Sequence, residues 1–304
     1  MIRVNNLSKF YGAKAAINNL SFEIKTGEIV GFIGPNGAGK TTTFKCLASL
    51  LHPSTGEIFI NDVNIQENPQ IARNIIGYLP EETPLIDELS VNEYLKYRFN
   101  LKNNHSKSGY NESFLESTGL TEIKNKKISS LSKGFKQRVG IAEALLGSPG
   151  ILLLDEPVNG LDPDQIIKIR NLLISLKESK TIIISSHILS ELDLICDKFI
   201  IISNGALKAF GTKLNIIESR VRLSFGIIEL SGINDEIISK VKALSEIKEI
   251  TVENNTIKLS LQSDTLKNAQ IKLSQIIKES PFHILRFNIE QPNLESLYLE
   301  LANE

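Results

Sequence analysis

Residues 34–42 contain the residue types that bind a chain of phosphates. Glycines let successive backbone N–H groups turn toward a polyanion, and the N-terminus of a following helix adds partial positive charge. A lysine supplies a point charge for the β- and γ-phosphates, and the next threonine offers a hydroxyl to Mg²⁺. We therefore predict that this loop binds a nucleoside triphosphate. The predicted phosphate-binding residues are Gly34, Pro35, Asn36, Gly37, Ala38, Gly39, Lys40, Thr41 and Thr42.

The residues on either side support this prediction. The apolar run 29–33 is typical of a buried strand, and residues 44–51 have the apolar spacing of a helix. The pattern G-x-x-x-x-G-K-[ST] binds phosphate when it lies between a strand and a helix. The alternative is a chance glycine-rich turn before a buried helix, and the complete pattern in its proper context disfavours it.

A second apolar strand, predicted over residues 151–155, ends in the carboxylate Asp155, and Glu156 follows directly. Beside a phosphate loop, Asp155 is expected to hold Mg²⁺ through water. Glu156 is expected to polarise the water that attacks the γ-phosphate. The alternative is that these two residues are simply the charged end of a strand.

Two further segments contain residues suited to a nucleotide. Ser132 and Gly134 lie just before a helix predicted from Lys136, and this is a second N-terminus able to receive a phosphate. Tyr11 lies between the first two predicted strands. From the residues alone, it is either a turn aromatic with no further role or a ring that stacks on a nucleotide base.

The elements that position these residues alternate between strand and helix. This alternation around a phosphate loop predicts an α/β fold with a mostly parallel sheet covered by helices on both faces. A mainly helical block is expected at about residues 85–145. Residues 225–289 predict a small ferredoxin-like β-α-β-β-α-β domain, followed by a helix over 294–301.

Composition is that of a globular protein. The chain has 304 residues, of which 41% are hydrophobic and 23% charged, with a formal net charge of −1. This charge gives no support for nucleic-acid binding. Cys46 and Cys196 are too far apart in the sequence to form a metal or redox motif. We expect no signal peptide, and no apolar run reaches the length of about 18 residues that a membrane span needs.

The order of five motifs resembles the nucleotide-binding domain of ABC transporters over residues 1–211. This resemblance implies a P-loop NTPase cassette with a RecA-like core and antiparallel β and helical subdomains. Residues 220–304 are then a C-terminal accessory α+β domain. The motifs are the phosphate loop, LSKGFKQR at 131–138, LLLDEP at 152–157, GLDP at 160–163 and SSH at 185–187.

The resemblance implies that two such domains meet head to tail and enclose two ATP molecules. Ser132 and Gly134 of one chain would contact the γ-phosphate held by Lys40 of the other chain. Asp162 would lie at the seam. Because the ATPase motifs are intact, a homodimer is workable.

The remaining roles concern the reaction and the base. By resemblance, His187 would contact the γ-phosphate and help to position water against Glu156. Tyr11 would stack on adenine. These expectations give an ATPase that uses ATP and Mg²⁺.

The sequence departs from the family pattern in two places. Lys133 and Phe135 replace a glycine and a glutamine of the usual LSGGQ segment. Glu81 stands where the family has a glutamine, and its carboxylate can still reach Mg²⁺ or a water bound to it. Both departures resemble cassettes of ABC-2 type exporters, including gliding-motility-type proteins, as does the ending at 293–301.

We therefore expect an ATPase subunit that binds a separate ABC-2 type permease at the cytoplasmic face of the membrane. Two alternatives remain open. One is a soluble ABC ATPase acting on ribosomes or DNA, although such relatives generally have two cassettes or a long coiled-coil insertion. The other is a binding module without hydrolysis, which the intact Glu156 and His187 disfavour. The C-terminal domain could regulate hydrolysis, stabilise the dimer or simply pack.

Overall fold

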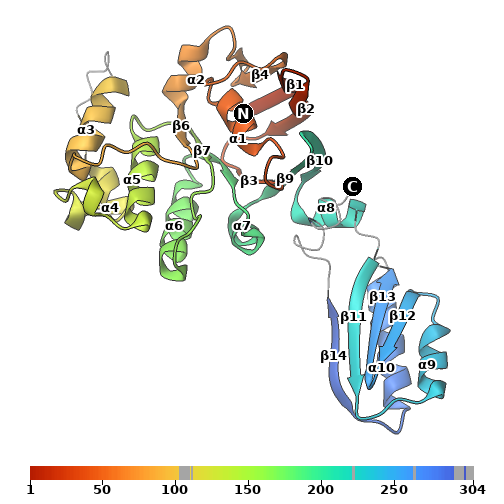
Figure 1. Ribbon diagram of the computed structural model, residues 1–304. Coiled ribbons are helices and arrows are strands. Elements are labelled where there is room, and N and C mark those ends of the chain that lie inside the picture. The colour runs from red at the N-terminus through yellow and green to blue at the C-terminus, as the bar shows by residue number, and fades with distance from the viewer. Residues whose placement is uncertain (103–109, 111, 221–222, 263–264, 291–297, 299–304) are drawn as a thin grey trace. The chain divides into compact units, whose positions relative to one another are not determined.

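The computed structural model describes residues 1–102, 110, 112–220, 223–262, 265–290 and 298. The chain divides into two compact units, Met1–Thr212 and Lys213–Glu304 (Figure 1). The expected domains were 1–211 and 220–304. The difference is helix α8 (Lys213–Arg220), which the sequence analysis did not anticipate and which belongs to the second unit.

The central element of the first unit is a six-stranded sheet. Its strands are β3 (Ile29–Ile33), β6 (Ile76–Leu79), β7 (Ile151–Leu154), β8 (Thr181–Ser185), β9 (Lys198–Ser203) and β10 (Ala206–Gly211). They lie in the order β10-β9-β3-β8-β7-β6, and every neighbouring pair is parallel except β10 with β9. The expected mostly parallel sheet is therefore confirmed.

One face of this sheet packs on helix α1 (Lys40–Leu47) and on a second, antiparallel sheet. Phe44 and Leu47 of α1 are buried with Phe32 of β3 and with residues of the second sheet. Cys46 belongs to this core, and burial raises the pKa of its thiol to about 11. The strands of the second sheet are β1 (Ile2–Tyr11), β2 (Lys14–Ile24), β4 (Thr55–Ile60) and β5 (Val63–Asn64).

The opposite face packs on helices α6 (Pro163–Leu176) and α7 (Leu189–Ile195). Ile184 of β8 lies against Ile169 of α6 and Leu192 of α7, whereas its neighbour Ile183 points into the core of the first face. This alternation explains why the central strands are apolar on both sides. Helices thus cover both faces of the sheet, as the sequence predicts.

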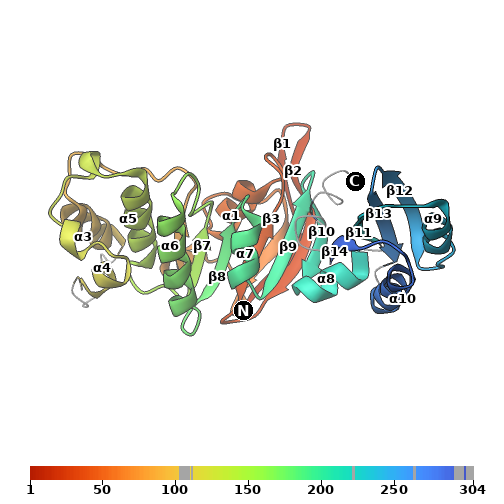
Figure 2. The ribbon, with the colours of Figure 1, turned by 90° about the horizontal axis from the view of Figure 1, so that it is seen from below.

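The helical block forms a core of its own at one end of the first unit (Figure 2). Tyr94 and Leu95 are fully buried there against Val139. The block consists of α3 (Val91–Lys102), α4 (Ser113–Ser117), two 3₁₀ turns (Thr121–Ile123 and Ile128–Ser130) and α5 (Lys133–Leu145).

Helix α5 begins at Lys133, three residues before the expected start at Lys136. The reason is a side-chain cap, because the Ser132 hydroxyl accepts a hydrogen bond from the Phe135 N–H. Short helix α2 (Pro69–Ile75) was not anticipated from the sequence.

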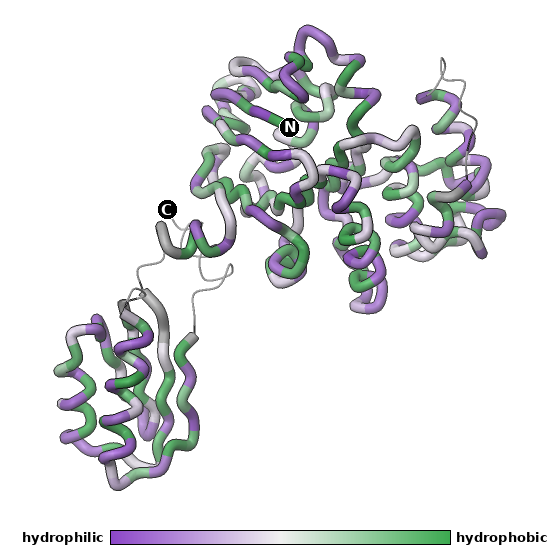
Figure 3. Tube along the Cα trace, turned by 180° about the vertical axis from the view of Figure 1, so that it is seen from behind, coloured by the Kyte–Doolittle hydropathy of each residue, from purple (hydrophilic) through white to green (hydrophobic). Residues whose placement is uncertain are grey.

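The second unit has the predicted β-α-β-β-α-β order after α8. Its sheet is antiparallel, with the order β12-β13-β11-β14. Green and purple positions alternate along its helices in Figure 3, as expected for helices with one apolar face. The elements are β11 (Leu223–Leu230), α9 (Asp235–Lys242), β12 (Ile247–Glu253), β13 (Thr256–Gln262), α10 (Leu266–Lys278) and β14 (Ile284–Glu290).

Both helices pack on the same face of this sheet. Ile237 of α9 and Leu273 of α10 are buried in one cluster with Ile228 and Leu259 of the strands. The helix expected over 294–301 lies, apart from Tyr298, outside the described residues. Within the part of the chain that is described, no helix is both long enough and apolar enough to cross a membrane.

Candidate functional site

The phosphate loop connects the end of β3 to the start of α1. Gly37 and Gly39 have φ angles of 80° and 105°, which residues with a Cβ rarely adopt. A Cβ on Gly39 would lie 2.4 Å from the carbonyl oxygen of Ala16, and one on Gly34 would lie 2.7 Å from that of Ile202. Backbone conformation therefore requires glycine at 37, close packing against β9 requires it at 34, and both reasons apply at Gly39, which packs against β2.

Lys40 and Thr41 begin α1, directly after this loop. The Lys40 ammonium is buried and donates hydrogen bonds to the carbonyl oxygens of Gly34 and Pro35, at 2.7 and 3.3 Å. Among the described residues, no ion pair joins the Lys40 ammonium to a carboxylate. A buried cation held by carbonyls is suited to receive an anion at the same place. Thr42 follows in the first turn of α1.

Asp155 comes directly after β7 and is 1% exposed. One carboxylate oxygen accepts a hydrogen bond from the Thr41 hydroxyl at 2.7 Å, and the other accepts one from the Ser185 hydroxyl at 2.6 Å. Two donors thus satisfy a buried carboxylate that faces the phosphate loop. The structure thus brings together Thr41 and Asp155, the two residues that were each predicted to serve Mg²⁺.

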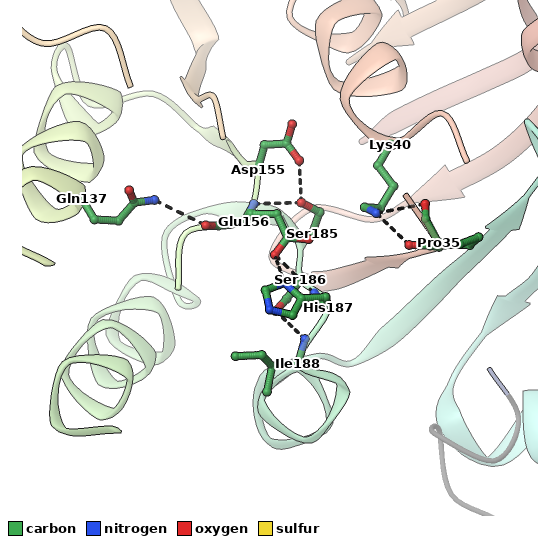
Figure 4. Close-up of polar contacts among 10 residues, drawn as sticks. Pro35, Lys40, Gln137, Asp155, Glu156, Ser185, Ser186, His187 and Ile188 are labelled. Atoms are coloured by element: carbon green, nitrogen blue, oxygen red, sulfur yellow. Dashed lines mark hydrogen bonds and ion pairs between the residues drawn. The ribbon is translucent and has the colours of Figure 1, made fainter. Parts of the chain in front are cut away.

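Glu156 and His187 are in direct contact. The His187 Nδ1 lies 2.7 Å from Oε2 of Glu156, and the His187 backbone N–H donates to the same oxygen at 3.3 Å. Figure 4 shows this pair between Gln137 and Lys40, next to Asp155 and Ser185. The Glu156 side chain is 8% exposed and that of His187 is 56% exposed, so the imidazole is the member open to solvent.

The backbone of Glu156 has a φ of 52°, in the left-handed region that non-glycine residues rarely occupy. Its N–H donates to the Ser185 hydroxyl at 2.9 Å, and its carbonyl accepts from the Gln137 amide at 3.5 Å. Neighbouring groups thus hold a conformation that costs about 1–3 kcal/mol, as is typical of functional sites.

Glu81 follows β6. The end of β6 adjoins the end of β7, because the Asp155 N–H donates to the Leu79 carbonyl at 2.9 Å. Burial, and then the charges of Asp155 and Glu81, raise the pKa of the Tyr78 hydroxyl. Glu81 therefore follows a strand whose neighbour is followed by Asp155, and the charges of both carboxylates act on the Tyr78 hydroxyl.

These oxygen donors fit Mg²⁺. The ion prefers hard oxygen ligands and is commonly held by one or two protein groups together with phosphates and water. The Thr41 hydroxyl and the Asp155 carboxylate meet at hydrogen-bond distance beside the loop. Together with Glu81, they supply a donor set of the required chemistry.

Ser132, Gly134 and Asp162 form a second group. Gly134 is so close to α6 that a Cβ there would lie 1.6 Å from the Gln165 side-chain oxygen. Asp162 caps α6 by accepting from the Gln165 N–H at 2.9 Å. No hydrogen bond or ion pair among the described residues joins Ser132, Gly134 or Asp162 to the phosphate loop.

Tyr11 ends β1 and is 53% exposed, so it lies in a strand and not in the turn itself. The Lys9 ammonium lies 5.6 Å from the centre of its ring. An exposed ring with a cation on it is free to receive a base on its other face. Among the described residues, no hydrogen bond, ion pair or ring contact connects Tyr11 to Lys40.

Two residues of this site had no individual role in the sequence analysis. Ser185 joins Asp155 to Glu156, and Gln137 joins α5 to Glu156. Both stood inside motifs quoted for the resemblance. The sequence did contain a signal for Ser185: it is a small residue with a hydroxyl, at the end of a strand next to the strand that carries the predicted metal ligand.

Comparison with known proteins adds a family and its relatives. Residues 17–159 match the family described as ABC transporter. The chain is 31% identical to the linearmycin resistance ATP-binding protein LnrL of Bacillus subtilis (strain 168), over 99% of this chain and 98% of that protein. It is 33% identical to the bacitracin transport ATP-binding protein BcrA of Bacillus licheniformis, over 99% and 97%.

A solved structure is similar to a large part of this chain. It is a dimer of an ATP-binding cassette in a post-hydrolysis state, bound to ADP and Pi. The likeness has a TM-score of 0.62 at 28% identity and covers 70% of this chain and 98% of that one.

Proposed function

The chain belongs to the ABC transporter family, and we propose that it is the ATP-hydrolysing subunit of an ABC-2 type exporter. Two contacts beside the phosphate loop carry the ATP-hydrolysing part of this proposal: the Thr41 hydroxyl donates to Asp155, and the His187 imidazole contacts the Glu156 carboxylate. Likeness to LnrL and BcrA extends over nearly the whole chain and so includes the C-terminal unit.

ATP binding begins with the loop. The backbone N–H groups of residues 34–39 and the N-terminus of α1 would receive the β- and γ-phosphates. The Lys40 ammonium would exchange its two carbonyl acceptors for phosphate oxygens. Tyr11 would stack on adenine. Mg²⁺, held by Thr41 and Asp155 with Glu81 nearby, would neutralise charge on the phosphates.

Hydrolysis needs a water aligned with the γ-phosphate. The Glu156 carboxylate would accept a proton from that water, and the imidazole of His187 would hold the carboxylate and contact the γ-phosphate. The contact between these two side chains argues against a binding module that has lost hydrolysis. Ground-state binding can persist without Glu156, because this residue acts on the water and does not hold the phosphates.

The second half of the site comes from another copy of the chain. Ser132 and Gly134 are at the N-terminus of α5, and their described contacts join them to Phe135 of α5 and Gln165 of α6, and not to Lys40. A head-to-tail homodimer would bring this N-terminus to the γ-phosphate of the partner, with Asp162 at the seam. The similar solved cassette is a dimer, and this supports the arrangement.

A groove in the first unit is suited to a segment of the permease. It has a volume of about 330 Å³ and lies between the end of α1, β6 and the helical block. Leu50 and Leu101 on its lining are 60% and 52% exposed, while Arg98 pairs with Glu143. An apolar helix with a polar face would cover these leucines. Closure of the dimer would then move the groove, and with it the permease.

The relatives suggest which compounds to test. LnrL and BcrA are named for linearmycin resistance and bacitracin transport. We therefore propose that the exporter handles antimicrobial compounds, with these two as the first candidates. The subunit would be bound peripherally at the cytoplasmic face of the membrane through its permease.

The test of the ATPase dimer uses Glu156→Gln. This variant is expected to form a dimer with ATP and Mg²⁺ and to lose hydrolysis by about 100-fold or more, since general base catalysis contributes about 10²–10⁴. Adding Ser132→Arg should abolish the ATP-dependent dimer, measured by size-exclusion chromatography with light scattering. Ser179→Arg, at an exposed serine after α6, is the matched control and should leave the dimer intact. Hydrolysis at the wild-type rate in Glu156→Gln would remove Glu156 from this role.

A further inference from the structure

Ser185 lies at a position where a single hydroxyl serves two parts of the site. It is the last residue of β8, pairs in register with Phe32 of β3, and is 0% exposed. Its hydroxyl donates to one oxygen of Asp155 at 2.6 Å and accepts from the N–H of Glu156 at 2.9 Å. A serine hydroxyl has one proton to donate and lone pairs to accept, so both bonds can exist together.

Each bond controls a different group. The bond to Asp155 fixes the rotation of that carboxylate, so that its other oxygen faces Thr41. The bond from Glu156 holds a backbone with a φ of 52°, and this backbone sets where the Glu156 side chain begins. Asp155 is predicted to hold the metal, and Glu156 is predicted to activate the water. Ser185 therefore connects the metal-binding carboxylate with the carboxylate that acts on the water.

Other neighbours cannot replace this hydroxyl. Thr41 is the second donor to Asp155, but it is also the predicted metal ligand. Gln137 reaches only the Glu156 carbonyl, at the longer distance of 3.5 Å. Without Ser185, one oxygen of a nearly wholly buried carboxylate and one N–H in a strained conformation would lose their partners.

We propose that Ser185 is a positioning residue for hydrolysis, which sets the Asp155 carboxylate for the metal and the Glu156 carboxylate for the water at the same time. This inference rests on the proposed ATPase function. Ser185 is not a catalytic residue, because it is fully buried and, among the described residues, its hydroxyl bonds only to Asp155 and Glu156.

The experiment compares Ser185→Ala with Ser186→Ala in the full chain. Ser186 is the next residue and is equally buried, but its hydroxyl accepts from the Ile188 N–H and does not contact Asp155 or Glu156. For Ser185→Ala we expect kcat for ATP hydrolysis to fall by about 100-fold, as for misplacement of a reacting group by about 1 Å. KM for ATP at saturating Mg²⁺ should stay within about threefold, because the groups that hold phosphate remain.

The second readout does not depend on hydrolysis. The Mg²⁺ concentration that gives half-maximal enhancement of ATP binding should rise by about tenfold in Ser185→Ala, because loss of a group that orients a metal ligand typically costs about 10–100-fold. ATP binding in EDTA should be unchanged. If the wild-type chain binds ATP without hydrolysing it, the proposed ATPase function fails, while this Mg²⁺ titration still decides the role of Ser185.

Two more variants separate positioning from packing. Ser185→Thr keeps the hydroxyl and should recover kcat to within about threefold of wild type. Ser185→Cys keeps the volume but donates weakly, so it should behave as Ser185→Ala does and serves in its place if the alanine variant does not fold. The inference is overturned if the alanine or cysteine variant has wild-type kcat and Mg²⁺ requirement. It is also overturned if kcat falls with no change in Mg²⁺ requirement and no recovery in Ser185→Thr.

Discussion

At the scale of single residues, Lys40 shows how the chain is prepared for an anion. Its ammonium is 8% exposed and is bound by two carbonyl oxygens of its own loop. A buried charge of this kind is costly unless it is paired. The triphosphate would supply the missing negative charge, and for this reason most of the contribution of Lys40 should appear on ATP binding.

Replacing Lys40 by alanine should weaken ATP binding by about 100-fold, equivalent to about 3 kcal/mol for a charged hydrogen-bonded contact. Lys45→Ala, at an exposed position of the same helix, is the control and should bind ATP as the wild type does. Isothermal titration calorimetry of the two folded variants would measure the difference. Equal affinities would contradict the assignment of the loop.

At the scale of elements, the start of α1 depends on its packing against β2. Gly39 is the N-cap of α1 with no side-chain cap, and its φ of 105° turns the chain from loop to helix. The carbonyl oxygen of Ala16 in β2 occupies the place of a Cβ at this position. The helix N-terminus and the loop N–H groups are therefore fixed by one glycine.

Gly39→Ala should disrupt this junction and abolish ATP binding, because both backbone conformation and space are unsuited to a Cβ. Gly27→Ala is the matched control, since Gly27 has a positive φ of 83° but open space around its Cβ position. Both variants carry the strain of a left-handed residue, of order 1 kcal/mol. Nucleotide binding that falls equally in the two would show that strain alone, and not the contact with Ala16, is responsible.

The elements predicted best from sequence are those with strong local signals. Strand β3 has the predicted bounds of residues 29–33, because its apolar run ends directly at the glycine-rich loop. Helices α2 and α8 are short, at seven and eight residues, and their sequences gave no clear periodicity. The start of α5 was wrong because Gly134 was assigned to a loop, whereas the Ser132 cap makes it helical.

The site could be predicted in part for a different reason. Thr41 and Asp155 meet because parallel strands place their carboxyl ends at one edge, a rule that needs no coordinates. The two bonds of Ser185 depend on the register between neighbouring strands and on the φ of Glu156. Neither quantity can be obtained from residue types and spacing, and so Ser185 had no individual role until the structure showed its contacts.

At the scale of the whole molecule, the chain is built of two units with separate cores. Residues of the phosphate loop, Asp155, Glu156 and His187 all belong to Met1–Thr212. The second unit has its own cluster of buried apolar residues and its own sheet. Each unit therefore has what a domain needs to fold alone.

A chain truncated after Thr212 should remain folded and bind ATP within about threefold of the full-length affinity, since independent units change each other's sites little. Circular dichroism would establish folding, and calorimetry would give the affinity. A folded fragment that no longer binds ATP would show that residues beyond 212 take part in the site.

A chain that drives a membrane exporter should bind a permease in the cell. We would test this by affinity purification of the tagged full chain from its native host in mild detergent, with mass spectrometry of the partners. Three chains are compared: wild type, Leu50→Glu in the groove, and Leu194→Glu on α7. Leu50 and Leu194 are 60% and 63% exposed, so the two substitutions are matched in burial.

We expect the wild type and Leu194→Glu to recover a polytopic membrane protein of the ABC-2 type, and Leu50→Glu to lose it while keeping ATP hydrolysis. Recovery of ribosomal or DNA-associated proteins, with no membrane protein, would contradict the exporter assignment. That result would indicate a soluble ABC ATPase instead.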